Sequence, residues 1–219
     1  MFPMAASSAI PQPRRPSGST REQILEAARQ AFFEKGYEGC SIRDLERRSG
    51  LTRGAIYYHF GGKQEIYVAV LCDGLRLLRA DFEAASAGGD ADPRSGLAAV
   101  VHRYCAFHRT QPQIFQIAQH FFFGSASTGD LDPQLVRDVH TEASRCLEIL
   151  VALLRNGMDR GVFLDRDPYF EAVLIWSMAT NLVQLADESR GVRFLQLSWE
   201  EIVERLLESI RDRLCTDPG

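Results

Sequence analysis

The chain has 219 residues, of which 45% are hydrophobic, and a formal net charge of −4 at pH 7. This length allows one small and one larger domain with a sizeable core. The start shows no apolar leader, and the longest strongly apolar uncharged run, residues 172–186, is too short and too polar to span a bilayer, so we expect a soluble, cytoplasmic protein without a membrane partner.

Residues 1–18 combine four prolines with small polar residues, which predicts a flexible arm. Arg14 and Arg15 in this arm could contact a DNA minor groove or stay in solvent. Ser19 and Glu22 then form a capping-box pattern. Apolar residues at helical spacing predict a first helix from there to about residue 35, where a glycine closes it.

Two short capped helices and a tight turn are predicted within residues 41–63. Ser41 has the spacing to cap the first of them, and Gly50 supplies the positive φ that ends it. Thr52 caps the second helix, in which Ile56 and Phe60 are four residues apart and face inward. Together these features predict a helix-turn-helix.

The outward face of the second helix carries hydrogen-bonding and stacking groups. Such a face can satisfy phosphate oxygens and base acceptors together, because most protein contacts to a duplex position it and few specify its sequence. Arg53 is the best candidate for direct base readout. The alternative is that Tyr57, Tyr58 and His59 form an aromatic stripe packed in a core.

The segment that carries these features reads GLTRGAIYYHFGGKQEIY. It resembles the recognition helix and following turn of the tetracycline-repressor-like (TetR) family of bacterial transcription regulators, and the resemblance extends over residues 20–67. It implies an all-α protein with an N-terminal three-helix helix-turn-helix DNA-binding domain at residues 19–66. A C-terminal helical bundle at residues 67–215 would bind an effector and dimerise.

The resemblance also implies a function and its site residues. The protein would be a ligand-responsive, sequence-specific repressor, not an enzyme, that a small hydrophobic effector releases from a palindromic operator. The residues implied to approach bases or the sugar backbone of double-stranded DNA are Arg53, Gly54, Ala55 and Tyr57. Those implied to bind phosphates are Thr52, Tyr58, His59 and Lys63, with Ser41 and Arg43 contributing from the supporting helix.

Two positions of the supporting helix depart from the family pattern. Glu46 and Ser49 stand where the family usually has alanine. Either this helix packs more loosely, or Glu46 swings out to pair with a neighbouring arginine.

Charge is divided unevenly along the chain. Residues 14–63 hold ten Lys and Arg against six Asp and Glu, whereas residues 64–219 hold 15 against 23. A basic end on an acidic remainder should approach DNA with that end only, with an affinity that falls steeply as salt rises.

Helical patterns continue after Lys63, without an alternating strand pattern or an internal repeat. Helices are predicted at 63–86, 94–110, 112–124, 132–158, 168–189 and 199–214, with turns at 87–90, 124–129 and 165–168. The last two helices are broadly apolar or amphipathic, which favours a four-helix interface in a homodimer, unless they bury against their own subunit. The predicted interface residues are Trp176, Ala179, Val183, Trp199, Val203, Leu206 and Ile210.

The middle of the chain is rich in aromatic residues, which favours an apolar pocket, although each residue alone could belong to the core. The candidate pocket residues are Tyr104, Phe107, Phe115, Phe122, Trp176 and Met178. The resemblance implies that an unidentified small apolar or amphipathic effector binds there and shifts the spacing of two DNA-binding ends. No other cofactor is expected.

His102, Cys105 and His108 are the candidate ligands for a metal site. His102 and Cys105 share a helix face, but His108 lies about 120° from His102, so one helix does not offer all three to one ion. The five cysteines form no CxxC pair and are expected to be reduced. We therefore expect no metal.

Two other classes of function stay open. An enzyme would need a site that the sequence does not reveal, because a Gly-rich phosphate loop, a GxSxG elbow and an HExxH pair are absent from it. The second open class is an interaction module that keeps the helix-turn-helix shape but does not bind DNA.

Overall fold

The computed structural model describes residues 19–89, 91–124, 131–186 and 197–215, and the regular structure within these ranges is entirely helical. The all-α prediction is confirmed. The described helices are α1 (Thr20–Gly39), α2 (Ile42–Ser49), α3 (Arg53–His59), α4 (Lys63–Ser86), α5 (Pro93–Thr110), α6 (Pro112–Phe123), α7 (Pro133–Asp159), α8 (Pro168–Ala186) and α9 (Trp199–Leu214).

The predicted boundaries agree closely with these helices. The first helix differs most, because Gly36 with a φ of 68° kinks α1 rather than ending it, and helical geometry resumes to Gly39. The arm at residues 1–18, with Arg14 and Arg15, lies outside the described residues, as do the last residues of the predicted helix 168–189 and most of the predicted turn at 124–129.

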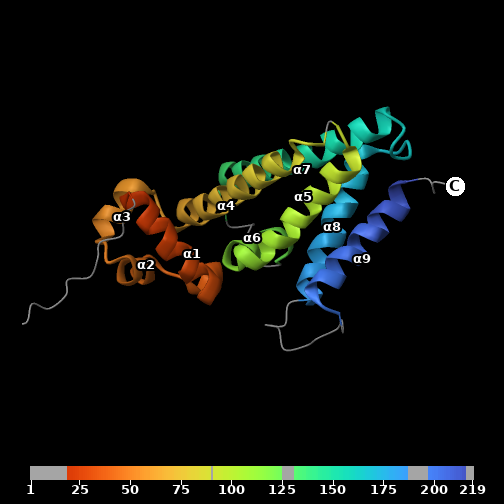
Figure 1. The fold of residues 1–219 in the computed structure, drawn as a ribbon. Helices are drawn as coiled ribbons and strands as arrows, with labels where there is room; N and C mark the ends of the chain where they lie inside the picture. The colour runs from red at the N-terminus through yellow and green to blue at the C-terminus, as the bar shows by residue number, and fades with distance from the viewer. Residues whose placement is uncertain (1–18, 90, 125–130, 187–196, 216–219) are drawn as a thin grey trace, which may run out of the picture.

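The molecule is elongated, with the first three helices at one end (Figure 1). We call α1–α3 the head and α5–α9 the body. Helix α4 runs from the head into the body and packs along α7, and α8 and α9 lie side by side at the opposite end. No helix within the described ranges combines the length and apolar composition needed to cross a bilayer.

Two hydrophobic cores organise these helices, and α4 contributes to both. The first core lies beneath the head and includes Ile24, Phe32, Leu45, Ile56, Leu71, Phe121 and Val139. The second core fills the body and includes Leu78, Phe82, Val100, Leu150, Leu154, Ile175 and Leu206. Because α6 and α7 supply part of the first core, the head does not have a core of its own, and the domain boundary at residues 66 and 67 stays a prediction.

Two buried carboxylates each join a pair of helices, α8 with α9 and α7 with α4. Glu171 of α8 accepts two hydrogen bonds from the Arg213 guanidinium of α9, at 2.7 and 2.9 Å. Glu142 of α7 accepts from Arg76 and Arg79 of α4, at 3.2 and 3.4 Å. A buried charge is tolerated only when it is paired and hydrogen-bonded, so each pair holds its two helices in one register.

Asp44 ties α1 to α2 and thereby orients the helix-turn-helix. Its carboxylate accepts from the Lys35 ammonium and from Arg47, both at 2.6 Å, and from the hydroxyl and backbone N–H of Ser41. The hydrogen bond from Lys35, followed by those from Ser41, lowers the pKa of Asp44 well below its ordinary range.

We predict an acid-sensitive contribution of Asp44 to stability. A carboxylate whose pKa is lower in the folded than in the unfolded chain stabilises the fold above its ordinary pKa and loses this effect as pH falls. The difference in unfolding free energy between wild type and Asp44→Asn should therefore be constant from about pH 8 to about pH 5 and shrink below that. Denaturant titrations at stepped pH measure it.

Lys35→Met serves as the control, because it removes the largest cause of the shift. In that background, Asp44→Asn should have a smaller effect at pH 7 than it has in wild type. A difference between wild type and Asp44→Asn that stays the same down to pH 3 would contradict this account.

Candidate DNA-binding surface and effector cavity

The helix-turn-helix is built by local capping and one buried anchor. Ser41 accepts from the backbone N–H of Asp44, Gly50 ends α2 with a φ of 70°, and the Thr52 hydroxyl accepts from the N–H of Ala55. Ile56 of α3 is completely buried in the first core, beside Phe60 at the end of the helix. These predicted features are all present, and they set which side of α3 faces outward.

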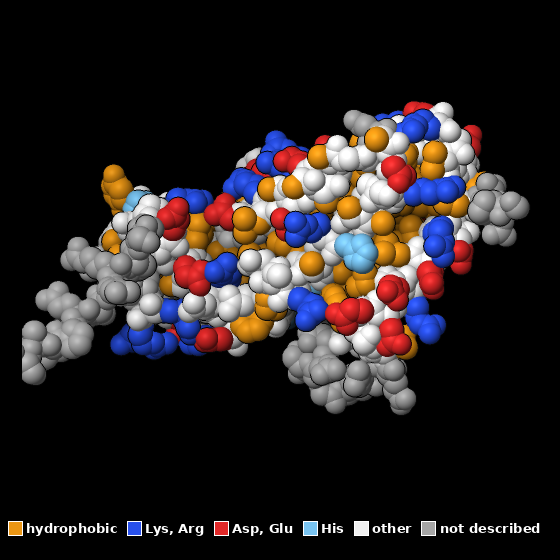
Figure 2. All heavy atoms as spheres, viewed as in Figure 1, with side chains coloured by type: hydrophobic (Ala, Val, Ile, Leu, Met, Phe, Trp, Pro, Cys, Tyr) orange, Lys and Arg blue, Asp and Glu red, His pale blue; other side chains and the backbone are white. Residues whose placement is uncertain are grey.

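The outward side of α3 is exposed at nearly every residue. Tyr58 and Tyr57 are 85% and 42% exposed, and side chains of the hydrophobic and histidine classes protrude from this end of the molecule (Figure 2). The packed aromatic stripe considered above is therefore wrong. The other exposed residues of this surface are Thr52, Arg53, Gly54 and His59, whereas Ala55 is half-buried.

Arg53 is held over Tyr57, one turn along α3. Its guanidinium carbon lies 5.4 Å from the ring centroid, and Nη2 donates to the tyrosine hydroxyl at 3.4 Å. The hydrogen bond to Tyr57 raises the pKa of the already permanently charged Arg53. The pair therefore presents a cation and a hydroxyl in a prearranged geometry, which is the kind of donor set that phosphates and base edges accept.

Lys63 opens α4 and is half-buried against Tyr37 of the head. Its Nζ donates to the Tyr37 carbonyl at 3.0 Å and lies 4.2 Å from the centroid of that ring. An ammonium has three donors, so this contact orients the group and leaves capacity for a phosphate. Ser41 and Arg43 are exposed, and the Ser41 hydroxyl donates to Asp44 at 2.6 Å.

The two departures from the family pattern have different outcomes. Ser49 is buried, and its hydroxyl donates to the Leu45 carbonyl at 2.7 Å and accepts from the N–H of Leu51 at 3.3 Å. The serine is thus satisfied within its own turn. Glu46 is half-buried, and among the described residues it forms no ion pair with an arginine; it acts on Arg53 only through space.

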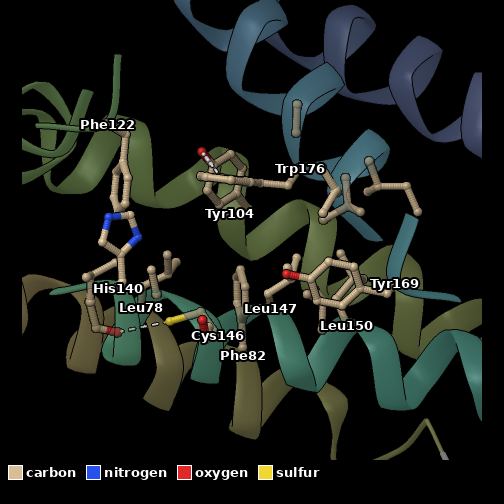
Figure 3. A pocket seen from close by; sticks show the side chains of 18 of the residues that line it. Leu78, Phe82, Tyr104, Phe122, His140, Cys146, Leu147, Leu150, Tyr169 and Trp176 are labelled. Carbon is tan, nitrogen blue, oxygen red and sulfur yellow. Dashed lines mark hydrogen bonds between the residues drawn. The ribbon is translucent and has the colours of Figure 1, made fainter. Parts of the chain in front are cut away.

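A cavity of about 350 Å³ lies in the body among α4, α5, α6, α7 and α8. This volume falls within the usual range for small-molecule sites. Figure 3 shows Phe82, Tyr104 and Trp176 around its interior, with His140 and Tyr169 also on the lining. Its walls are mainly apolar and aromatic.

Three of the six predicted pocket residues line this cavity, namely Tyr104, Phe122 and Trp176. Phe107, Phe115 and Met178 do not belong to the described lining. Phe107 and Phe115 are buried in the second core and Met178 packs against it.

Sequence reasoning missed the wall that α7 supplies. His140, Ser144 and Leu147 follow one another at spacings of four and three residues, so they share one helix face. That shared face is the signal in the sequence, whereas the pocket prediction rests on aromatic residues and Met178.

The hydroxyl of Tyr104 is the polar centre of the cavity interior. It lies 2.5 Å from the Thr180 hydroxyl and accepts from the indole N–H of Trp176 at 3.1 Å. Burial raises the pKa of Tyr104 to about 12. The phenol therefore stays neutral and fixes the orientation of the Trp176 ring.

The predicted dimer residues are instead largely buried within their own subunit. Trp176 lines the cavity, and Trp199 stacks on His108 at 5.9 Å. The five buried in the second core are Ala179, Val183, Val203, Leu206 and Ile210. The apolar side of each helix covers the core of its own subunit. Amphipathicity alone therefore did not identify the helix surface that faces outward.

A different side of α8 remains outside. Phe170 and Leu185 are 57% and 43% exposed. Leu174, half-buried, and Asn181, exposed, lie between them at helical spacing. Apart from Asn181, this stripe is an apolar surface of α8 that the described part of the subunit leaves exposed or half-buried.

The three possible metal ligands are not brought together. His102 is exposed, Cys105 is buried with its pKa raised by burial to about 11, and His108 packs edge-on against Phe115. The described part of the chain contains no group of three or more His, Cys, Asp or Glu residues placed to hold a metal ion.

Comparisons with known proteins agree with this architecture. Residues 24–70 match the family described as bacterial regulatory proteins, tetR family, and residues 97–210, just over half of the chain, match the tetracyclin repressor-like C-terminal domain. One similar solved structure is the crystal structure of the TetR family transcriptional regulator PfmR from Thermus thermophilus. The two sequences are 28% identical, the TM-score is 0.69, and the match covers 85% of this chain and 96% of the PfmR chain.

Two curated relatives match over shorter segments. The HTH-type transcriptional repressor AcnR of Corynebacterium efficiens is 48% identical over 52 residues, which are 24% of this chain and 28% of AcnR. The HTH-type transcriptional regulator SrpR of Pseudomonas putida is 31% identical over 143 residues, or 65% of this chain and 62% of SrpR. The matches thus span less than two thirds of either relative.

Both halves of the chain therefore match one family, and the helical head and body agree with its two matched domains. The chain belongs to the tetR family of bacterial regulatory proteins, which are transcription regulators rather than enzymes.

Proposed function

We propose that the protein is a sequence-specific DNA-binding repressor that reads its operator with α3. The observation that carries this proposal is the division of α3 into two sides. Ile56 and Phe60 hold the helix on the head, and Arg53, Tyr57 and Tyr58 face outward. A recognition helix of a helix-turn-helix enters the major groove with such residues. The family match at residues 24–70 covers α3, and the 52-residue match to the repressor AcnR supports this function.

The distribution of charge supports approach by the head. The basic balance falls in residues 14–63 and the acidic balance in the rest of the chain. A duplex attracts the first and repels the second, which orients the encounter. A regulator of this kind works where the chromosome is, so a cytoplasmic location is part of the proposal.

Arg53 should carry sequence discrimination. We predict that Arg53→Ala lowers the preference for the best-bound duplex over a single-base variant at the contacted position by about 1–3 kcal/mol. Affinity for unrelated duplexes should change less. Competition binding with a set of single-base variants measures this. A discrimination profile equal to that of wild type would contradict base readout by Arg53.

Lys63 should bind a phosphate and so act on all sequences alike. We predict that Lys63→Ala reduces the slope of log affinity against log salt by about one and weakens specific and unrelated duplexes equally. Circular dichroism checks that loss of the Tyr37 contact leaves the head folded. Arg155→Ala, an exposed cation on α7 of the body, is the matched control and should keep the wild-type slope. An unchanged slope for Lys63→Ala would refute its role.

We further propose a homodimer that joins through the exposed stripe on α8. A palindromic operator requires a two-fold reader, and family members of this fold act as dimers. Phe170, Leu174 and Leu185 provide an apolar surface that a second copy would cover.

This placement predicts that Phe170→Asp shifts the protein toward monomers and weakens binding to a two-half-site duplex by at least about tenfold. Sedimentation velocity gives the oligomeric state. Leu77→Asp changes an equally exposed leucine on α4 and should leave the dimer intact. A Phe170→Asp protein that sediments as wild type would rule out this face.

The cavity supports a further part of the proposal, release of DNA by a small apolar effector. Helix α4 contributes Leu75 and Leu78 to the cavity wall while its first turns pack in the first core. Helix α6 places Phe121 in that core and Phe122 on the cavity wall. A ligand that binds one arrangement of these helices better than another would change the position of the head, because only differential affinity shifts such an equilibrium.

A further inference from the structure

The described lining of the cavity contains no charged side chain. None of the described residues that form it is Lys, Arg, Asp or Glu. A carboxylate or an ammonium placed inside would lose its hydration without gaining an ionic partner, which is costly. The described lining thus offers no oppositely charged side chain to a ligand ion of either sign.

Aromatic rings occupy much of the wall. Phe82 and Tyr104 lie with ring centroids 6.4 Å apart, and Phe122 meets Trp176 edge to face at 6.1 Å. Ring faces and edges that such a wall presents to the cavity favour a ligand ring packed beside them. Figure 3 shows these side chains converging from α4, α5, α6 and α8 on one space.

Polar groups without a hydrogen-bond partner among the described residues occur at the opening rather than inside. Tyr104 already bonds to Thr180 and Trp176. His140, Ser144 and Tyr169, by contrast, line the cavity and are exposed, so they lie at its mouth. The described residues offer no hydrogen-bond partner to their side chains. His140 and Ser144 are one turn apart on α7, close enough to share one polar group of a ligand.

We propose that the effector is an uncharged aromatic molecule whose rings pack against Phe122 and Trp176 and whose single hydrogen-bonding group is held at the mouth by Ser144 and His140. This inference rests on the proposed effector site and specifies the chemical class that it takes. It separates the cavity from sites that hold a carboxylate or ammonium headgroup with an oppositely charged side chain.

Three probes that share a biphenyl and differ in the polar group, which is neutral, anionic or cationic, test this class directly: 4-biphenylmethanol, 4-biphenylcarboxylate and 4-phenylbenzylammonium. The full chain with Trp199→Phe has Trp176 as its only tryptophan, so its fluorescence reports binding at the cavity wall, and calorimetry on the wild-type chain gives the affinities. The alcohol should bind at least about tenfold more tightly than either ion. Equal or tighter binding of the carboxylate or the ammonium would overturn the proposal, as would no binding of the alcohol.

Ser144→Ala tests the polar contact at the mouth. It should weaken the alcohol about threefold and leave the two ions unchanged. Ser209→Ala, an exposed serine on α9 away from the cavity, should leave all three affinities unchanged. If Ser144→Ala binds the alcohol as wild type does, the assigned position of the polar group is wrong.

Duplex binding measured on the same samples separates this inference from the proposed function. If the alcohol binds but duplex affinity does not change, the class of ligand is supported and the release step of the proposed function fails. If the duplex is bound but the alcohol is not, the repressor function stands and the ligand class is wrong.

Discussion

The burial of one side of α3 is the constraint on which the rest of the structure depends. A helix of seven residues is not stable alone in water. It forms here because Thr52 caps its start and because Ile56 and Phe60 are buried in the first core. Once those two residues are fixed, helical geometry leaves Arg53 and Tyr57 no direction but outward. The polar surface is therefore a consequence of apolar packing.

The same core connects the head to the body. Phe121 of α6 packs in the first core, and its ring centroid lies 6.5 Å from that of Tyr67. The next residue, Phe122, lies on the cavity wall. The rings of Phe121 and Phe122 meet edge to face, with their centroids 5.1 Å apart. On the other side, Glu142 holds α7 to Arg76 of α4. Packed interiors transmit displacement rather than absorb it, so the first core links the cavity wall to α3 by continuous packing although their residues are far apart in the sequence.

Local signals in the sequence were sufficient to predict the helices and the turn, because caps, glycines with positive φ and apolar spacing act over a few residues. The outward side of α3 followed from Ile56 and Phe60 alone. Tertiary questions were harder. The apolar sides of α8 and α9 were predicted to form a dimer interface, yet Val183 and Leu206 cover the subunit's own core. Only the structure shows which part of a helix surface is buried within its own subunit. Phe107 and Phe115 were likewise predicted to line the pocket, yet they are buried in the second core.

The most direct test of the account is a selection of bound duplexes from a random pool by the purified full chain at low ionic strength, without added ligand. The account predicts enrichment of an inverted repeat whose half-sites are separated by about one helical turn or a multiple of it. A pool that shows no enriched sequence after repeated selection would contradict the claim that α3 reads DNA.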